Sequence, residues 1–450
     1  MTIEEAVNKT QSHITQMYSS LIEKDCKNDD YNAQQLKSYI KKFITDENIT
    51  VNDQSGIGII DIDNLVNIIY QEMTGFSVLD ELLGRNDIEE INILSYKDIN
   101  VNYDNGQMKR YKRHFFSPEH LIDVTKRMLR ESGKILDLAT PVVVGNLNNR
   151  VRITVFCSPI VDKNLGLGAS IRIINPKQLK EEDFVRNGTA TKEILDFLKY
   201  TYKFGVSVCI GGSTGSGKTT IMSFLLSVID NHKRLITIEQ DTREYNRIKY
   251  DKDGYMLNNV IHMVTRKSKD EDQNIDQSKL LEIALTSNPD YICVNEMKGE
   301  ESITAVSSAN TGHAVMTTIH TNSCTDMPYR ILSLCKLKSD ISDSVLMPMI
   351  TQAFPIMVYI EKLPDGSRRI QEITETIGIK DGVPQMKTLY RFATDKSVSY
   401  EVENDDGEKY TKYEIKGHYE KVNKPSEKIK ELYKKNAMLN TEAYKSIFGD

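Results

Sequence analysis

The sequence predicts an α/β protein built around a phosphate-binding loop, and three observations lead to this prediction. Residues 212–219 read Gly-Ser-Thr-Gly-Ser-Gly-Lys-Thr, which fits the pattern G-x-x-x-x-G-K-[ST]. An apolar, β-branched run at 206–210 precedes this segment and an apolar run at 221–229 follows it, as expected for a buried strand and a packed helix. From about residue 183 onward, helical segments alternate with apolar strands, which is the pattern of the α/β class.

The residue types of this loop suit phosphate binding. Glycine lets the backbone curl so that several N–H groups point at phosphate oxygens, and the start of the following helix favours anions. Lys218 is expected to reach the β- and γ-phosphates, and the Thr219 hydroxyl is expected to hold Mg²⁺. A chance loop is the alternative, and the flanking strand and helix argue against it. The predicted nucleotide-binding residues of the loop are Gly212, Ser213, Thr214, Gly215, Ser216, Gly217, Lys218, Thr219 and Thr220.

The composition is that of a soluble globular protein. The 450 residues are 39% hydrophobic and 27% charged, which suits about three domains. The formal net charge of −6 argues against a chain built as a whole to bind nucleic acid. We see neither a signal-peptide pattern nor an apolar run of about eighteen residues, so we expect a cytoplasmic protein that reaches the membrane through partners. The cysteines form no C-x-x-C pair, which argues against a zinc or redox site.

Residues 1–75 are expected to form a polar helical region. Apolar residues recur at helical spacing in two stretches, of which the first holds Ile14 and Met17 and the second holds Leu36 and Ile40. No set of catalytic residues occurs here, so an adaptor or packing role is favoured over a docking site for a partner.

Residues 76–178 are expected to form a small α+β domain. The expected elements are a short helix at 79–83, strands at 91–93 and 99–103, a tight turn at Asn105-Gly106, a helix from Ser117-Pro118, strands at 151–157 and 169–174, and a linker at Asn175-Pro176-Lys177. Arg150, Arg152 and Arg172 stand out in this domain. From the pattern alone, a solvated strand face is favoured over phosphate contact for these arginines.

Residues 179–450 are expected to hold the P-loop domain and a charged C-terminal tail. Three of its strands are expected at 235–239, 291–296 and 314–320. They end in Glu239, Glu296 and His320, and ligands of open α/β sheets bind beyond the carboxyl ends of the strands. These three side chains are therefore expected near the loop. The stretch from 396 to 450 is highly charged, and a solvated tail or a helix at the edge of a ring is favoured there.

Two acids and two histidines are the candidate catalytic residues. Glu296 stands where a P-loop enzyme keeps the acid that orients Mg²⁺-bound or attacking water, so Thr219 and Glu296 are the predicted metal ligands. Glu239 could take a proton from the attacking water. His313 and His320 bracket one strand and could sense the γ-phosphate, and a structural hydrogen-bonding role fits their spacing equally well.

Four boxes in this order resemble the secretion-superfamily ATPases, the hexameric motors of type II secretion, type IV pili and type IV secretion. They are the Walker A loop at 212–219, an acidic box at 235–239, a Walker B box at 288–299 and a histidine box at 310–322. The resemblance runs from about residue 76 to about residue 395 and is closest to the ATPases of Tad/Flp pilus systems. The four-cysteine zinc insertion of type II secretion ATPases is absent, which favours the Tad/Flp or type IV secretion branch.

The resemblance implies a RecA-like P-loop ATPase domain preceded by a small α+β (PAS-like) domain, assembled as a homohexamer. It implies ATP and Mg²⁺ as ligands, and a polytopic inner-membrane platform protein as the partner through which hydrolysis powers pilus assembly or retraction. Glu239 becomes the expected general base and Glu296 the Walker B acid, and His313 and His320 become the expected γ-phosphate sensors. The nucleotide-contacting arginines that it implies are Arg152, Arg172 and Arg266.

Three residues depart from the family pattern, and two other functions stay open. Gln240 stands where the family usually has Asp, Asn295 where it usually has Gly, and Lys298 where Arg is common. A RecA-like DNA translocase needs the same loop and acids, but it should also show basic loops with interleaved aromatics, which we do not find. A nucleotide-dependent scaffold without hydrolysis is the third function, and Gln240 and Asn295 allow it.

Overall fold

The computed structural model describes residues 1–22, 30–52, 59–104, 107–147, 150–173, 179–240, 243–266, 271–403 and 409–449. The chain divides into two compact units, Met1–Asn175 and Pro176–Asp450. The predicted turn at Asn105-Gly106 and the predicted linker at Asn175-Pro176-Lys177 lie outside the described residues. The division into three domains, with boundaries after residues 75 and 178, stays a prediction. In the described part of the chain, no helix is both long enough and apolar enough to cross a membrane.

Three helices form the N-terminal part of the first unit: α1 (Ile3–Ile22), α2 (Asp30–Asp46) and α3 (Ile62–Thr74). Each helix carries one apolar stripe, and the three stripes are buried against one another around Ile14, Leu36 and Ile69. Met17, which the sequence places on the apolar face of α1, is 62% exposed. The N-terminal helical region predicted from the sequence is therefore present, with a narrower apolar stripe on α1 than expected.

The remainder of the first unit is a small α+β structure. Its elements are α4 (Leu79–Leu83), β1 (Ile88–Ile93), β2 (Ile99–Tyr103), β3 (Met108–Arg110), α5 (Pro118–Glu131), β4 (Val142–Leu147), β5 (Val151–Cys157), the 3-10 helix η1 (Lys163–Leu165) and β6 (Leu167–Ile173). The strands form one antiparallel sheet in the order β3-β2-β1-β6-β5-β4. Helix α5 begins as predicted, because Ser117 Oγ accepts a hydrogen bond from the His120 N–H at 3.2 Å and Pro118 takes the first helical position. Buried α5 residues such as Val124 pack on alternate strand residues such as Ile153.

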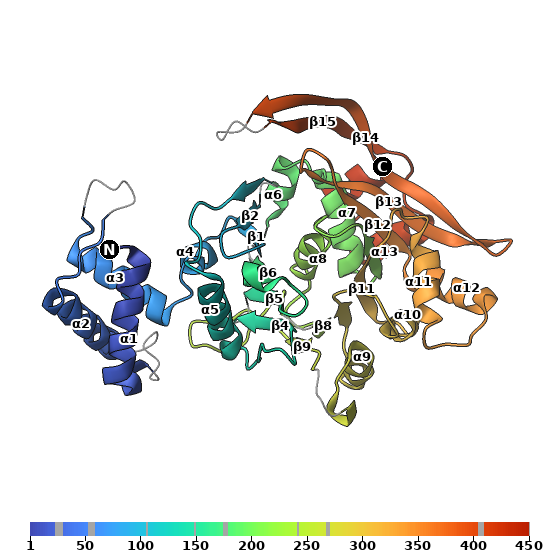
Figure 1. Cartoon of the computed structure of the whole chain (residues 1–450). Helices are drawn as coiled ribbons and strands as arrows, with labels where there is room; N and C mark the ends of the chain where they lie inside the picture. The colour runs from blue at the N-terminus through green and yellow to red at the C-terminus, as the bar shows by residue number, and fades with distance from the viewer. Residues whose placement is uncertain are drawn as a thin grey trace. The chain divides into compact units, whose positions relative to one another are not determined.

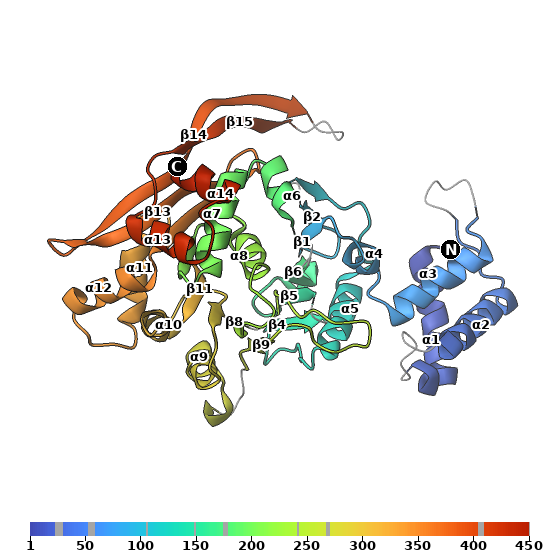
Figure 2. The same cartoon turned by 180° about the vertical axis from the view of Figure 1, so that it is seen from behind.

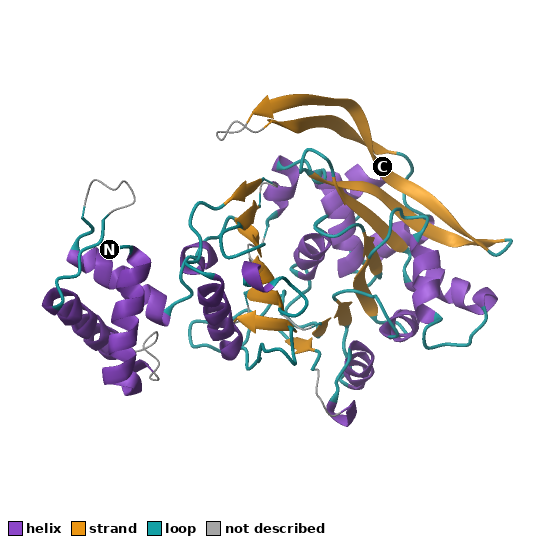
Figure 3. Cartoon of the chain, in the orientation of Figure 1, coloured by secondary structure: helices purple, strands orange, loops and turns teal. Residues whose placement is uncertain are grey.

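The second unit is an α/β structure around a nine-stranded sheet (Figure 3). Its first half holds α6 (Glu181–Arg186), α7 (Lys192–Lys203), β7 (Val208–Gly211), α8 (Lys218–Leu226), β8 (Leu235–Glu239), β9 (Val260–Val264), η2 (Glu271–Gln273), α9 (Gln277–Thr286), β10 (Tyr291–Val294), α10 (Glu301–Asn310) and β11 (Ala314–Ile319). Its second half holds α11 (Met327–Cys335), α12 (Asp343–Ala353), β12 (Ile356–Lys362), β13 (Arg368–Lys380), β14 (Val383–Glu403), β15 (Lys409–Lys421), α13 (Glu427–Lys435) and α14 (Glu442–Phe448).

The order of the strands places the phosphate-binding loop in the middle of the sheet. The order is β15-β14-β13-β12-β7-β11-β10-β8-β9, in which the pairs from β12 to β9 are parallel and the pairs from β12 to β15 are antiparallel. The loop follows β7, which lies between β12 and β11. The unit therefore has the RecA-like P-loop fold predicted from the sequence.

Helices cover both faces of the parallel strands. Val208 and Ile210 face a core made with helices α6, α7, α8, α13 and α14, whereas Cys209 between them faces a second core made with α9, α10, α11 and α12. Burial on both faces explains why these strands are apolar runs rather than alternating sequences.

The C-terminal segment differs from the predicted solvated tail or ring-edge helix. The strands β14 and β15 form a long antiparallel hairpin, and α13 and α14 pack on α7 (Figures 1 and 2). Tyr433 is fully buried: its hydroxyl donates to the Phe197 carbonyl at 2.9 Å and lies 2.8 Å from Thr201 Oγ1. The sequence pattern does not predict that this segment packs on the domain, because its few large buried aromatic residues stand among many exposed lysines.

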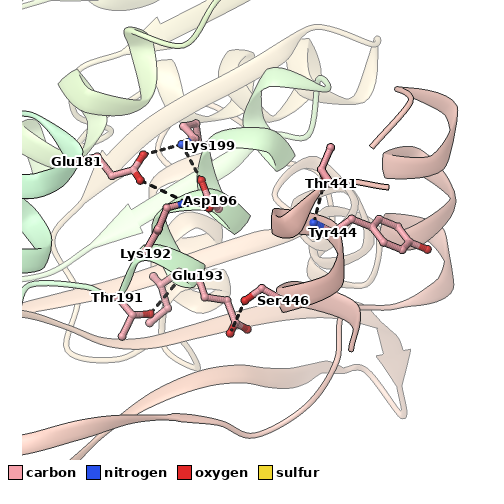
Figure 4. A network of polar contacts seen from close by, with 10 residues as sticks. Glu181, Thr191, Lys192, Glu193, Asp196, Lys199, Thr441, Tyr444 and Ser446 are labelled. Carbon is pink, nitrogen blue, oxygen red and sulfur yellow. Dashed lines mark hydrogen bonds and ion pairs between the residues drawn. The ribbon is translucent and has the colours of Figure 1, made fainter. Parts of the chain in front are cut away.

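A network of polar contacts ties α6, α7 and α14 together (Figure 4). On one side of α7, Asp196 forms ion pairs with Lys192 at 2.8 Å and with Lys199 at 2.7 Å. Burial alone would raise the pKa of Asp196, but the hydrogen bonds from the two lysines hold it below its ordinary value. On the other side, the carboxylate of Glu193 accepts a hydrogen bond from Ser446 Oγ at 3.0 Å. The helix that precedes the P-loop strand is thus fixed by the last helix of the unit.

Candidate nucleotide site

The phosphate-binding loop connects the end of β7 to the start of α8. Gly217 caps α8 with a φ of 99°, a left-handed conformation that side chains with a Cβ rarely adopt. A Cβ on Gly212 would lie 2.1 Å from the Ile360 carbonyl oxygen, so only glycine fits there. The residue types of the Walker pattern are therefore required by the backbone path as well as by the ligand.

Lys218 lies within the curl of the loop. Its side chain is buried, and its Nζ donates to the carbonyls of Gly212 at 2.9 Å and Ser213 at 2.8 Å. Ser216 Oγ is also buried, and it has no hydrogen-bond partner among the described residues. A curled loop with a held ammonium group and an unsatisfied hydroxyl fits an anionic ligand such as a phosphate chain.

The ends of the neighbouring strands meet the loop at the same edge of the sheet. The Gly212 N–H donates to the Ile319 carbonyl at 3.2 Å, and the Met297 N–H donates to the Thr318 carbonyl at 2.8 Å. These bonds extend the parallel pairing past the regular strands. They bring Glu296 and His320 beside the loop, as the sequence predicts.

Lys218, His320 and Glu296 form one chain of polar contacts. Lys218 Nζ lies 3.5 Å from His320 Nδ1, and His320 Nε2 lies 3.0 Å from Glu296 Oε1. An ammonium group can only donate, so Nδ1 accepts and the Nε2–H donates to the carboxylate. Neutral histidine therefore links the loop lysine to the acid.

Glu239 ends β8 at the same edge but is fully buried. Its Oε2 accepts hydrogen bonds from the N–H groups of Glu244 and Tyr245, the latter at 3.0 Å. Burial raises the pKa of Glu239 to about 7, although both N–H groups favour the ionised form. A carboxyl group with a pKa near neutrality suits proton transfer.

The structure shows the hydrogen-bonding environment of two residues that depart from the family pattern, Asn295 and Gln240. Asn295, in place of the usual Gly, accepts a hydrogen bond from the Tyr245 hydroxyl at 2.5 Å through Oδ1. Tyr245 is also the residue whose N–H holds Glu239, so Asn295 connects the Walker B segment to the acidic box. Gln240 Oε1 is buried and has no hydrogen-bond partner within the described part of the chain.

His313 is not brought to this site within the unit. It precedes β11, whereas His320 follows β11, so the length of the strand separates them by about 20 Å. His313 Nδ1 instead lies 3.2 Å from both Thr311 Oγ1 and the Ser308 carbonyl. A residue before a parallel strand and one after it occupy opposite edges of the sheet, so only His320 lies at the phosphate-binding edge, and a role of His313 as a γ-phosphate sensor stays a prediction.

The candidate arginines fall in both units. Arg266 follows β9 near the acidic box, since the N–H of the preceding Thr265 donates to the Glu239 carbonyl at 3.0 Å. Its side chain donates to Gln273 Oε1 at 3.2 Å. Arg152 and Arg172, in the first unit, are direct cross-strand neighbours on β5 and β6. Their contact with a nucleotide stays a prediction.

Sequence reasoning assigned no role to Arg368, which contacts the phosphate-binding loop. Its Nε donates to the Gly215 carbonyl at 2.9 Å from the start of β13. The signal in the sequence was the Asp-Gly-Ser-Arg-Arg segment at 365–369, which resembles the family and whose last two residues begin β13. Its contact across 153 residues could not be read from spacing.

The fold and this edge define a P-loop unit of the RecA-like class. Residues 142–357 match the model of the family described as Type II/IV secretion system protein. The resemblance to secretion ATPases found in the sequence is thereby confirmed. The assignment to the Tad/Flp branch stays a prediction.

The chain is similar in sequence to several curated relatives, at 24% to 32% identity. A putative conjugal transfer protein of Mycobacterium tuberculosis (strain ATCC 25618 / H37Rv) is 24% identical over 320 residues, which cover 68% of this chain and 86% of the relative. An uncharacterized protein of Methanocaldococcus jannaschii is 27% identical over 270 residues, which cover 60% of this chain but only 47% of the relative. The type IV secretion system protein VirB11 of Bartonella quintana is 32% identical over 139 residues, or 29% of this chain and 35% of the relative.

Solved structures align over most of the chain. The Legionella pneumophila ATPase DotB covers 82% of this chain and 84% of its own, with 14% identity and a TM-score of 0.47. The VirB11 ATPase of Brucella suis covers 66% of this chain and 95% of its own, with 20% identity and a TM-score of 0.34.

Proposed function

We propose that this chain is the ATPase subunit of a homohexameric motor that powers assembly or retraction of a type IV, Tad/Flp-like pilus or a related secretion system. ATP is the substrate, and a polytopic inner-membrane platform protein is the partner that receives the motion. The observation that carries the proposal is the polar chain from Lys218 through His320 to Glu296 at the P-loop edge. In a protein that only switches between nucleotide-bound states, such a loop needs only to bind phosphates. A loop lysine that is linked to an acid at the end of a strand also suits hydrolysis.

In the proposed hydrolysis, each residue at the phosphate-binding edge of the sheet has a separate role. Lys218 holds the β- and γ-phosphates by exchanging the carbonyls of Gly212 and Ser213 for phosphate oxygens. His320 shares contacts with Lys218 and Glu296, so it responds when the lysine moves to the γ-phosphate. Glu239 takes the proton of the attacking water, because its raised pKa lets it exchange a proton near neutral pH.

The residues present fit Mg²⁺. Thr219 offers a hydroxyl in the first turn of α8 and Glu296 offers a partly exposed carboxylate, and magnesium prefers oxygen ligands of this type. When bound, the cation would neutralise charge on the phosphates. Arg368, Arg266, Arg152 and Arg172 are proposed to supply further positive charge around the nucleotide.

A scaffold that binds nucleotide without hydrolysis is the second candidate. The burial of Glu239 favours it, since a fully covered acid must be uncovered before it meets water. The two candidates differ in turnover but not in nucleotide affinity.

Steady-state hydrolysis of ATP by the purified chain, with and without Mg²⁺, separates these functions. Lys218→Ala, Glu296→Gln and the exposed-surface control Glu300→Gln are measured alongside, and each is sized by light scattering with ATP. Magnesium-dependent turnover in a hexamer, lost in the first two variants and kept in the control, supports the motor. Binding of a fluorescent ATP analogue without turnover in the wild type supports the scaffold. Binding of the hexamer to vesicles that contain the platform protein then tests the partner.

A further inference from the structure

A closed ring of hydrogen bonds surrounds the carboxylate of Glu239. On one side, Oε2 accepts from the N–H groups of Glu244 and Tyr245. On the other side, Thr237 Oγ1 lies 3.5 Å from Oε1 and 2.6 Å from His262 Nδ1. The ring closes where the Arg247 N–H reaches His262 Nε2 at 3.2 Å, because Arg247 follows Tyr245 along the same loop.

The direction of each bond in the ring follows from the chemistry of its members. A backbone N–H can only donate, so His262 Nε2 must accept and carries no proton. Neutral imidazole then carries its proton on Nδ1 and donates it to Thr237 Oγ1 at 2.6 Å. The Thr237 hydroxyl proton is thereby left to point at Glu239 Oε1.

Strand pairing explains why these residues meet. Thr237 and His262 are direct partners in the parallel pair of β8 and β9, and Glu239 lies two residues beyond Thr237 on the same face. Thr237 is fully buried and His262 is partly buried. The pair is therefore built into the sheet and does not depend on a flexible side chain.

We propose that Thr237 and His262 are positioning residues for Glu239, which orient its carboxylate and keep it ionised for proton transfer. This inference rests on the proposed ATP hydrolysis. A carboxylate offers about four acceptor positions. Two on Oε2 are filled by N–H groups and one on Oε1 is filled by Thr237, so the attacking water would take the remaining position on Oε1 once the buried carboxylate is uncovered.

The electrostatic surroundings agree with this role. Burial, together with the nearby Arg243 and Arg247, lowers the pKa of His262 to about 4, so the imidazole stays neutral in the tautomer that the ring requires. Glu244 raises and Arg243 lowers the pKa of Glu239, and the neutral Cys293 and Tyr245 face it from β10 and from the loop. The hydroxyl of Thr237 adds a donor to the ionised form.

The test is the pH dependence of kcat for six forms of the full chain. Thr237→Val removes the hydroxyl at constant shape and Thr237→Ser keeps it. His262→Leu removes both ring nitrogens, while His262→Asn keeps one N–H near the Nδ1 position. The double variant Thr237→Val/His262→Leu and the wild type complete the set. Thr374→Val, a buried threonine of the same sheet outside the site, is the matched control.

We call the chain of contacts from His262 through Thr237 to Glu239 the relay. It predicts a shift of the acidic limb of the pH profile of kcat. The limb should move up by about 0.5 to 1 pH unit in Thr237→Val and in His262→Leu, because the ionised carboxylate loses a donor. Serine, asparagine and control variants should stay near the wild type. If His262 acts through Thr237, the double variant should equal Thr237→Val alone. An unmoved limb in Thr237→Val, or fully additive shifts, overturns the relay.

Carbon-13 NMR of glutamate-labelled protein, assigned with Glu239→Gln, measures the same titration without turnover. A wild type that does not hydrolyse ATP refutes the proposed function. In that case, the relay is supported if Thr237→Val raises the titration midpoint of Glu239, and it is refuted if the midpoint does not move. Turnover in the wild type with an unmoved midpoint refutes the relay alone.

Discussion

Replacing Glu239 with glutamine should stabilise the second unit at alkaline pH while it abolishes hydrolysis. Burial raises the pKa of this carboxyl from an ordinary value of 4.5 to about 7. The folded chain therefore holds the proton more tightly than the unfolded chain, and the free energy of unfolding falls as the pH rises from 4.5 to 7. Above that window the whole cost of the buried charge is present.

The difference between the two pKa values corresponds to about 3 kcal/mol. Glutamine has nearly the same shape, keeps an oxygen for the N–H groups of Glu244 and Tyr245, and carries no charge. Glu239→Gln should therefore match the wild type near pH 4.5 and exceed it by about 3 kcal/mol at pH 8, or roughly 5 °C or more in melting temperature. The kcat of the variant should fall by about 100-fold or more.

Thermal unfolding at pH 5 and pH 8 measures the prediction, with the exposed Glu300→Gln as control. The informative quantity is the change in the stability difference between the two pH values, because it removes any constant effect of the amide. If the stability of the variant relative to the wild type does not increase between pH 5 and pH 8, ionisation of the buried carboxyl does not destabilise the fold. Its assignment as the proton acceptor would then lose its physical basis.

Four further predictions follow from described contacts. His320→Gln should lower kcat by about 100-fold with a smaller change in KM, as measured by steady-state kinetics, because the link between Lys218 and Glu296 is altered. Arg368→Ala should weaken binding of a fluorescent ATP analogue, since its contact with the Gly215 carbonyl supports the loop, and unchanged affinity would contradict that role. Tyr433→Ala should cost about 3–5 kcal/mol in urea unfolding, because it leaves a cavity between α7 and α13. Asp196→Asn should destabilise the chain at pH 7, and the loss should shrink only as the pH falls below 3.8 and through the lowered pKa of the paired carboxylate; a pH-independent loss would contradict the ion pairs.

The parts of the site that the sequence predicted are those fixed by short-range pattern. The loop at 212–219 carries its own chemistry, and Glu239, Glu296 and His320 end apolar strands whose direction in a parallel sheet sets their edge. The same rule places His313 at the opposite edge, because it precedes the strand that His320 follows.

The parts that the sequence missed depend on contacts over long distances. Arg368 reaches the loop from 153 residues away, and the hydrogen bond between Tyr245 and Asn295 joins two boxes that were considered separately. The burial of the two helices α13 and α14 against the domain was missed for a different reason. Their apolar residues are few, and Tyr433 needs α7 as a partner to be recognised as core.

The packing of α13 on α7 has a consequence for the order of events during synthesis. Thr201 and Tyr433, which contact each other, are separated by 232 positions. A ribosome that adds about 5–20 residues per second needs roughly 10 to 50 s to cover that distance. During this delay the face of α7 that Tyr433 covers stays uncovered, although the phosphate-binding loop has already emerged. A nascent chain should therefore leave this face of α7 open to chaperones until α13 has emerged and packed on it.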